Sequence, residues 1–157
     1  MGTTRGRFHL YVDTSVFGGV LDDEFANESR RFFDLVRKGR YVVLLSPVVI
    51  AELALAPEAV RAVLESIPDG ALLPVEITSE VIGLRDAYVK AGIVARRYMD
   101  DATHVAAATV ARADAAVSWN FKHIVRLDKM RGYNRVNLMS GFGIISIVTP
   151  REVLFDE

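Results

Sequence analysis

The stretch "FHLYVDTSVFGG", residues 8–19, places a carboxylate directly after a run of residues typical of a buried strand. Four of the five residues from Phe8 to Val12 are apolar, and Asp13 follows them at once. In open parallel α/β sheets, ligands bind beyond the carboxyl ends of the strands. Asp13 is therefore a candidate site residue, and the alternative for an aspartate at this position is to cap a following helix.

The rest of the chain alternates short apolar runs with longer amphipathic segments. We predict further strands over 41–46, 72–78, 115–119 and 143–150. Helices are predicted over 23–38, from Pro47 onward, and over 58–67, 79–92 and 99–113, with a last helix starting at Pro150. This alternation is typical of α/β proteins with helices on both faces of a mostly parallel sheet. The length of 157 residues predicts a single domain, residues 1–157.

The composition excludes several classes of protein. The chain has no cysteine, which excludes disulfides and thiolate chemistry and fits a cytoplasmic location. No apolar run approaches the roughly 18–20 residues of a membrane span. The first residues, "MGTTRGRF", lack the apolar core of a secretory signal. We therefore expect a cytoplasmic protein with no membrane partner.

The charge is balanced overall but uneven along the chain. A net charge of −1 does not by itself indicate a nucleic-acid-binding protein. Residues 121–135, "FKHIVRLDKMRGYNR", nevertheless hold five lysines and arginines against one aspartate. A solvated surface is the default interpretation of this segment. It becomes a candidate phosphate-binding segment if an acidic site lies nearby.

Four further polar residues, in three places along the chain, fall where a site in such a fold is expected. Glu52 lies on the helix after the second strand, Asp100 and Asp101 open the 99–113 helix, and Asn120 follows the fourth predicted strand. Each has an ordinary alternative: a solvated glutamate, acids favoured at a helix N-terminus, and an asparagine in a turn. Adjacent helical residues point about 100° apart, so only one of the two aspartates is expected to face the same site as Asp13.

Clustered carboxylates repel one another unless they are protonated or bound to a cation. An oxygen-rich set without cysteine suits Mg²⁺ or Mn²⁺, and such ions serve the hydrolysis of phosphate esters. His104 lies three residues after Asp101 and can share its helix face. We expect this histidine to hydrogen-bond a carboxylate, with metal ligation as the alternative.

Four motifs in order resemble those of PIN domains, a family of metal-dependent ribonuclease domains. They are "YVDTSVF", "SPVVIAEL", "DDATHVAAATVARADAAVSWNFKHI" and "ISIVTPREVL", and they span about residues 8 to 155. The resemblance implies a three-layer α/β/α fold with a central first strand and a mostly parallel sheet of four to five strands. It also implies an endoribonuclease dependent on Mg²⁺ or Mn²⁺, the toxin of a VapBC-type toxin–antitoxin pair. The implied partners are an RNA substrate, an antitoxin protein and a second copy of the chain in a homodimer.

The resemblance also assigns roles to residues of this chain. Asp13, Glu52 and Asp101 match metal-binding acids, with Asp100 as the alternative to Asp101 if the register differs by one. Asn120 stands where many members have a fourth aspartate, which lowers the formal charge of the site by one and leaves open whether one or two metals bind. The implied catalytic set comprises these acids and Asn120, and the implied substrate contacts are Ser15, Lys122, His123 and Arg126.

Two other functions remain open from the sequence alone. The first is a catalytically weak or inactive module on the same scaffold, binding RNA or protein, with Asn120 as the sign of lost activity. The second is a metal-dependent phosphatase or a nuclease acting on DNA, because nothing in the motifs reads the 2′-hydroxyl of RNA.

Overall fold

The computed structural model describes residues 6–154 and is built around a parallel sheet. Its five strands lie in the order β3-β2-β1-β4-β5, so the first strand is central, as expected. The strands are β1 (Phe8–Val12), β2 (Tyr41–Leu45), β3 (Leu72–Pro74), β4 (Ala115–Val117) and β5 (Ile147–Val148). All four strand pairings are parallel, which confirms the expected α/β class with a parallel central sheet.

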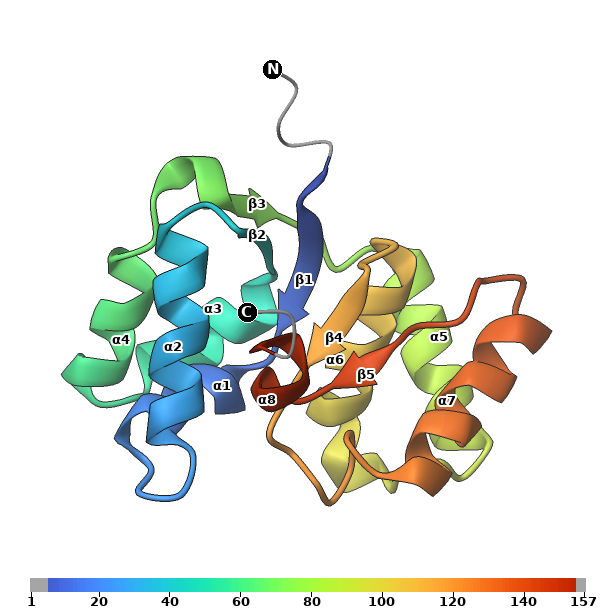
Figure 1. Cartoon of the computed structure of the whole chain (residues 1–157). Coiled ribbons are helices and arrows are strands. Elements are labelled where there is room, and N and C mark those ends of the chain that lie inside the picture. The colour runs from blue at the N-terminus through green and yellow to red at the C-terminus, as the bar shows by residue number, and fades with distance from the viewer. Residues whose placement is uncertain (1–5, 155–157) are drawn as a thin grey trace.

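Helices cover the sheet on both sides (Figure 1). Helices α2 and α8 pack together on one side, and α5, α6 and α7 pack on the other. The helices are α1 (Thr14–Gly18), α2 (Ala26–Arg37), α3 (Pro47–Ala54), α4 (Glu58–Glu65), α5 (Ser79–Lys90), α6 (Met99–Val110), α7 (Leu127–Met139) and α8 (Pro150–Val153). Single 3₁₀ turns occur at η2 (Gly19–Leu21), η3 (Asp69–Ala71) and η4 (Arg96–Tyr98). The helices predicted from the sequence are all present, with ends that differ by a few residues.

The main difference from the sequence-based expectation is α7. Residues 121–135 were expected to be a charged surface, but most of this segment belongs to a helix that buries Gly132, Tyr133, Val136 and Asn137. The pattern is obscured because Asn137, a polar residue, is fully buried and donates to Thr109 Oγ1 at 3.3 Å. Three predicted strands are also shorter than expected by two residues or more: 72–78 contains only Leu72–Pro74, 115–119 only Ala115–Val117, and 143–150 only Ile147–Val148.

The core forms where the central strand meets α6. Leu10, Tyr11 and Val12 of β1 are buried, and so is every residue of α6 from Ala102 to Thr109. The small side chains of α6 allow this helix to pack closely on several sides, as its alanine-rich sequence predicted. Since β1 and α6 are both held inside the core, the acidic residues at their ends are positioned by rigid elements.

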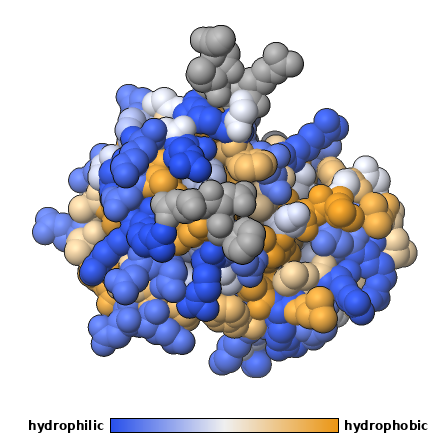
Figure 2. All heavy atoms as spheres, in the orientation of Figure 1, coloured by the Kyte–Doolittle hydropathy of each residue, from blue (hydrophilic) through white to orange (hydrophobic). Residues whose placement is uncertain are grey.

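The surface is uneven in polarity. Figure 2 shows mainly hydrophilic residues over α2 and more hydrophobic surface on the side of α7 and β5. Three large exposed apolar residues, Leu138, Met139 and Ile144, belong to the end of α7 and the segment after it. Within residues 6–154, no helix combines the length and the apolar character needed to cross a membrane.

Candidate active site

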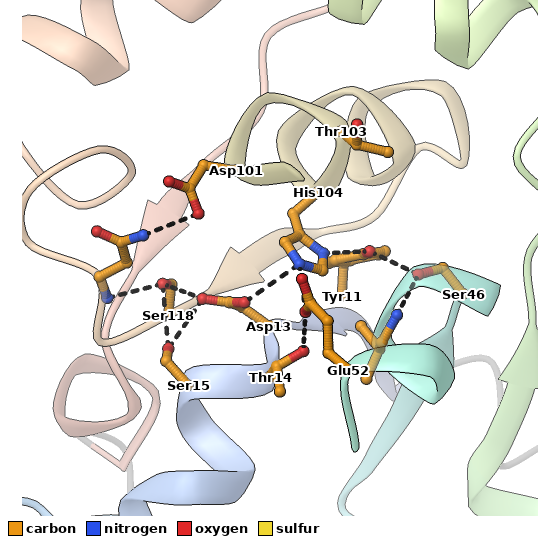
Figure 3. A network of polar contacts seen from close by, with 12 residues as sticks. Tyr11, Asp13, Thr14, Ser15, Ser46, Glu52, Asp101, Thr103, His104 and Ser118 are labelled. Atoms are coloured by element: carbon orange, nitrogen blue, oxygen red, sulfur yellow. Dashed lines mark hydrogen bonds and ion pairs between the residues drawn. The ribbon is translucent and has the colours of Figure 1, made fainter. Parts of the chain in front are cut away.

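Asp13 lies at the carboxyl end of the central strand, as the sequence predicted. It occupies the N-cap position of α1, but its side chain makes no capping hydrogen bond. Its carboxylate instead accepts hydrogen bonds at Oδ2 from Ser15 Oγ at 2.8 Å and Ser118 Oγ at 2.6 Å (Figure 3). The residue is only 7% exposed. The capping alternative is therefore wrong, and the carboxylate is held toward a polar cluster beyond the sheet edge.

Glu52 reaches the same cluster from α3. This helix starts directly after β2, with Pro47 in its first turn and Ser46 Oγ accepting from the Val49 amide at 3.3 Å. Glu52 Oε1 accepts a hydrogen bond from Thr14 Oγ1 and lies 2.9 Å from His104 Nε2. Burial acts to raise the pKa of Glu52, but the hydrogen bond and charge of His104 outweigh it, so the pKa lies below its usual value.

His104 lies between the two carboxylates (Figure 3). Its Nε2 is 2.9 Å from Glu52 Oε1 and 3.5 Å from Asp13 Oδ1, and its Nδ1 is 2.8 Å from the Tyr11 hydroxyl. The residue is 3% exposed. Burial alone lowers the pKa of His104, yet the hydrogen bond to Glu52 and the neighbouring carboxylate charges raise it above its usual value. The expected hydrogen bond between His104 and a carboxylate is thus confirmed.

Asp101 lies in the first turn of α6 and is partly buried. Its Oδ1 accepts a hydrogen bond from Asn120 Nδ2 at 3.0 Å. Burial, followed by the charge of Asp13, raises the pKa of Asp101 to about 6. Asp100, one residue earlier, is exposed, so the two aspartates do point in different directions as expected.

Asn120 uses both ends of its amide. Its Nδ2 donates to Asp101, while its Oδ1 accepts from the amides of Lys122 at 3.2 Å and His123 at 3.0 Å. These three contacts define the orientation of the side chain, since one end faces a carboxylate and the other faces two N–H groups. Asn120 therefore joins the first turn of α6 to the loop formed by residues 120–126.

The other candidate residues fall into different environments. Ser15 Oγ donates to Asp13 and accepts from the Trp119 amide at 2.9 Å, which fits a supporting role for the first aspartate. Lys122 is exposed, and the His123 ring stacks on Tyr98 with centroids 3.9 Å apart. Arg126 forms two hydrogen bonds to Asp128, at 2.6 and 2.8 Å, so its guanidinium already has an acidic partner.

Several hydroxyl groups of this cluster were not predicted to take part. Thr14 donates to Glu52, and Ser118 donates to Asp13. The Tyr11 hydroxyl lies 2.8 Å from both His104 Nδ1 and Ser46 Oγ. The position of Thr14 beside Asp13 was a usable signal, but Tyr11 lies within an apolar run that indicates only a strand.

The donor set suits a divalent cation. Asp13, Glu52 and His104 each offer one ligand atom, and these atoms lie within 4.8 Å of one another. Two carboxylates and an imidazole can coordinate Mn²⁺, and the carboxylates with water can coordinate Mg²⁺. Asp101 lies outside this compact group, although the charges of Asp13 and Glu52 raise its pKa. A nearby cation would relieve the excess of negative charge at these acids.

The chain is similar to known proteins in its structure. No protein-family model matches the chain, and no curated protein matches its sequence. VapBC2 from Rickettsia felis, solved bound to a DNA fragment from their promoter, is similar with a TM-score of 0.56 at 12% identity over 90% of this chain and 98% of that one. FitAcB from Neisseria gonorrhoeae gives 0.53 at 13% identity over the same shares of the two chains.

A third solved structure is VapC20 from Mycobacterium tuberculosis, described as a sarcin-ricin loop cleaving toxin. It gives a TM-score of 0.51 at 16% identity, covering 73% of this chain and 92% of that one. The fold class is therefore PIN-like: a parallel sheet flanked by helices, with acids at its carboxyl edge. Within that class, the chain has the fold of VapC-type PIN toxins.

Proposed function

We propose that this protein is an endoribonuclease that depends on Mg²⁺ or Mn²⁺ and acts in the cytoplasm as the toxin of a toxin–antitoxin pair. The observation that carries the proposal is the convergence of Asp13, Glu52 and His104 within 4.8 Å at the carboxyl edge of the sheet. The likeness to VapC20, a toxin that cleaves an RNA loop, supports RNA as the substrate.

In this proposal the residues have distinct roles. Asp13 and Glu52, which converge with His104, would hold the ion, and Asp101, which lies outside this compact group, would hold it through water. The bound ion supplies an activated water and stabilises negative charge on the phosphate. Ser15 and Ser118 orient Asp13 through the hydrogen bonds to its Oδ2, and Thr14 orients Glu52. Asn120 orients Asp101 through its amide nitrogen.

We also propose two protein partners, an antitoxin and a second copy of this chain. The likeness to VapBC2 supports an antitoxin that binds this chain. Ile50 and Leu55, on and just after α3, are exposed apolar residues close in sequence to Glu52, and we assign them to this interface. A homodimer is also proposed, and light scattering of the purified protein tests it.

The decisive experiment compares cleavage of an RNA panel by the unchanged protein, Asp13→Asn and Asp69→Asn. Asp69 is an exposed aspartate in η3, directly before β3. It therefore lies at the amino ends of the strands, away from the site, and is a matched control. Asp13→Asn and EDTA are each expected to lower cleavage on the order of a hundredfold or more, because both remove transition-state stabilisation by the ion. Expression of the unchanged protein should inhibit growth, and Asp13→Asn should not.

Other outcomes would assign the protein differently. Full cleavage by a clean Asp13→Asn preparation would contradict this site. Absence of RNA cleavage together with absence of Mg²⁺ or Mn²⁺ binding in calorimetry would favour the non-catalytic module. Preferential cleavage of DNA or of phosphate monoesters in the same panel would replace the ribonuclease assignment.

A further inference from the structure

Positively charged side chains gather beside the acidic site, on the side of Asp101. The Arg97 guanidinium carbon lies 5.0 Å from the centre of the Tyr98 ring. Tyr98 in turn stacks on His123, with ring centroids 3.9 Å apart and planes inclined by 28°. Lys122 precedes His123 in the 120–126 loop. We call Arg97, Tyr98, His123 and Lys122 the cationic stack.

The charges of this stack are not used to hold the fold. No ion pair between described residues involves Arg97 or Lys122, whereas Arg126 is paired with Asp128. Burial, and then the charges of Lys129, Lys122, Arg126 and Arg97, lower the pKa of His123 below its usual value. Arg97 and Lys122 therefore supply the positive charge of the stack, and the lowered pKa of His123 disfavours a further charge on its ring.

The backbone beneath the stack is rigidly held. The Asn120 carbonyl accepts from the amides of Ile124 at 3.1 Å and Val125 at 2.8 Å, and Ile124 is buried. The Tyr133 hydroxyl donates to the His123 carbonyl at 2.7 Å. A ligand bound here would therefore meet preorganised groups, which lowers the entropy cost of binding.

The stack is joined to the acidic site by one side chain. Asn120 donates to Asp101 at one end and accepts from the Lys122 and His123 amides at the other. The acids and the cationic stack are thus adjacent parts of one surface, on which a linear polyanion can contact both. An acidic protein segment would be repelled by Asp13, Glu52 and Asp101 at the same place. A nucleic acid is favoured because a metal ion at these acids would neutralise part of its phosphate charge.

We propose that Arg97 and Lys122, held on the Tyr98–His123 stack, bind the backbone phosphates of the RNA strand next to the scissile bond. This proposal rests on the proposed ribonuclease function and names the surface that holds the substrate. It replaces Arg126 by Arg97 among the residues that the sequence suggested for phosphate contact, because Arg126 is bound to Asp128.

The test is RNA binding without cleavage. Fluorescence anisotropy with a labelled single-stranded RNA is measured over a series of salt concentrations in the Asp13→Asn background. The double change Arg97→Gln/Lys122→Gln is compared with Lys38→Gln/Arg40→Gln, which removes the same charge at exposed residues before β2, at the opposite edge of the sheet. The first pair is expected to weaken binding roughly tenfold and to reduce the slope of log K against log salt by about 1.4, since each phosphate contact in a single strand contributes about 0.7.

Equal effects of the two pairs, or an unchanged salt slope, would overturn the proposal. Displacement of the RNA by poly-glutamate at an equal concentration of anionic groups would assign the surface to an acidic protein segment instead. The single change Lys122→Gln alters an exposed side chain that forms no ion pair with the described residues, and so serves if the double variant unfolds. If Asp13→Asn abolishes cleavage but the double variant binds RNA as tightly as its parent, this inference alone is rejected. If the double variant binds RNA more weakly but the unchanged protein cleaves no RNA, the ribonuclease function is rejected instead.

Discussion

His104 Nε2 lies 2.9 Å from Glu52 Oε1, and this contact places a buried imidazole beside the acids that are proposed to hold a metal. The same nitrogen lies 3.5 Å from Asp13 Oδ1. When protonated, the ring donates to Glu52 and to the Tyr11 hydroxyl and supplies a positive charge between the carboxylates. His104 thus compensates part of the negative charge that a divalent cation would otherwise neutralise.

The first prediction concerns protons released when a metal binds. Asp101, with a pKa raised to about 6, carries a proton in part of the population near about pH 6, and the raised pKa of His104 favours its protonated form. A cation at the carboxylates favours the deprotonated forms, so binding of Mn²⁺ at this pH should release protons. Calorimetry in buffers of different ionisation enthalpy measures the number released.

Two variants separate the contributions. His104→Gln and Asp101→Asn should each lower the number of protons released near about pH 6. The share of the release that comes from Asp101 should decline toward about pH 8, where a carboxyl group with a pKa of about 6 has already lost its proton in the unbound protein. Binding heats that do not depend on the buffer at any of these pH values would contradict the prediction.

The second prediction concerns the stability of the metal-free protein. Folding raises the pKa of Asp101 from 3.8 to about 6, so its contribution to stability is fully present below about pH 4 and is lost as the pH rises through about 6. Asp101→Asn removes the cost of the buried charge, while its side-chain oxygen can still accept from Asn120. The free energy of unfolding in EDTA should rise by about 1–3 kcal/mol at pH 8, and the gain should vanish near pH 4.

The matched control for this measurement is Asp100→Asn, which removes the same charge from the exposed neighbour. It should change the free energy of unfolding by no more than about 0.5 kcal/mol. An equal stabilisation by the two variants in urea denaturation would show that the effect is one of net charge and does not depend on the burial of Asp101.

The third prediction concerns the exchange of Asn120 for the acid found in many PIN domains. Asn120→Asp keeps an acceptor for the Lys122 and His123 amides but loses the donor to Asp101 and sets two carboxylates together. In EDTA at pH 8, the variant should lose about 1–3 kcal/mol of unfolding free energy. Added Mn²⁺ should raise its melting temperature more than that of the unchanged protein, since the variant adds a negative oxygen ligand. Equal melting temperatures of the two proteins in EDTA would show that the amide contact with Asp101 is dispensable.

The fourth prediction uses two adjacent glycines after Asp13. A methyl group at Gly19 would lie against Ser29 Oγ and within 2.9 Å of Trp119 Nε1, two atoms that hydrogen-bond each other at 2.9 Å. Gly19→Ala should therefore destabilise the protein by about 1–3 kcal/mol in thermal or urea denaturation. Gly18 has helical backbone angles and open space around it, so Gly18→Ala should be neutral or stabilising by up to about 1 kcal/mol. The reverse order of stabilities would contradict the packing around Trp119.

The sequence predicted those features that depend on local pattern. The apolar run Phe8–Val12 predicted a strand with Asp13 at its carboxyl end. The alternation of strands and helices along the chain predicted a parallel sheet. These predictions succeeded because strand and helix periodicity are set by which face of an element is buried. Helix α7 was missed because its buried face includes the polar Asn137, which is satisfied by hydrogen bonds from other elements.

Only the tertiary structure decided which side chains meet at the site. His104 lies 52 positions from Glu52, and Tyr11 lies 35 positions from Ser46, yet both pairs are in hydrogen-bond contact. Asn120 could be recognised as a departure from an acidic position, but its use of both amide ends depends on how the 120–126 loop packs against α6. By itself, the sequence determined that acids follow strands. The packing of β1, α3 and α6 then determined that a buried imidazole stands between two of them, because burial and hydrogen bonding depend on neighbours that are distant in the chain.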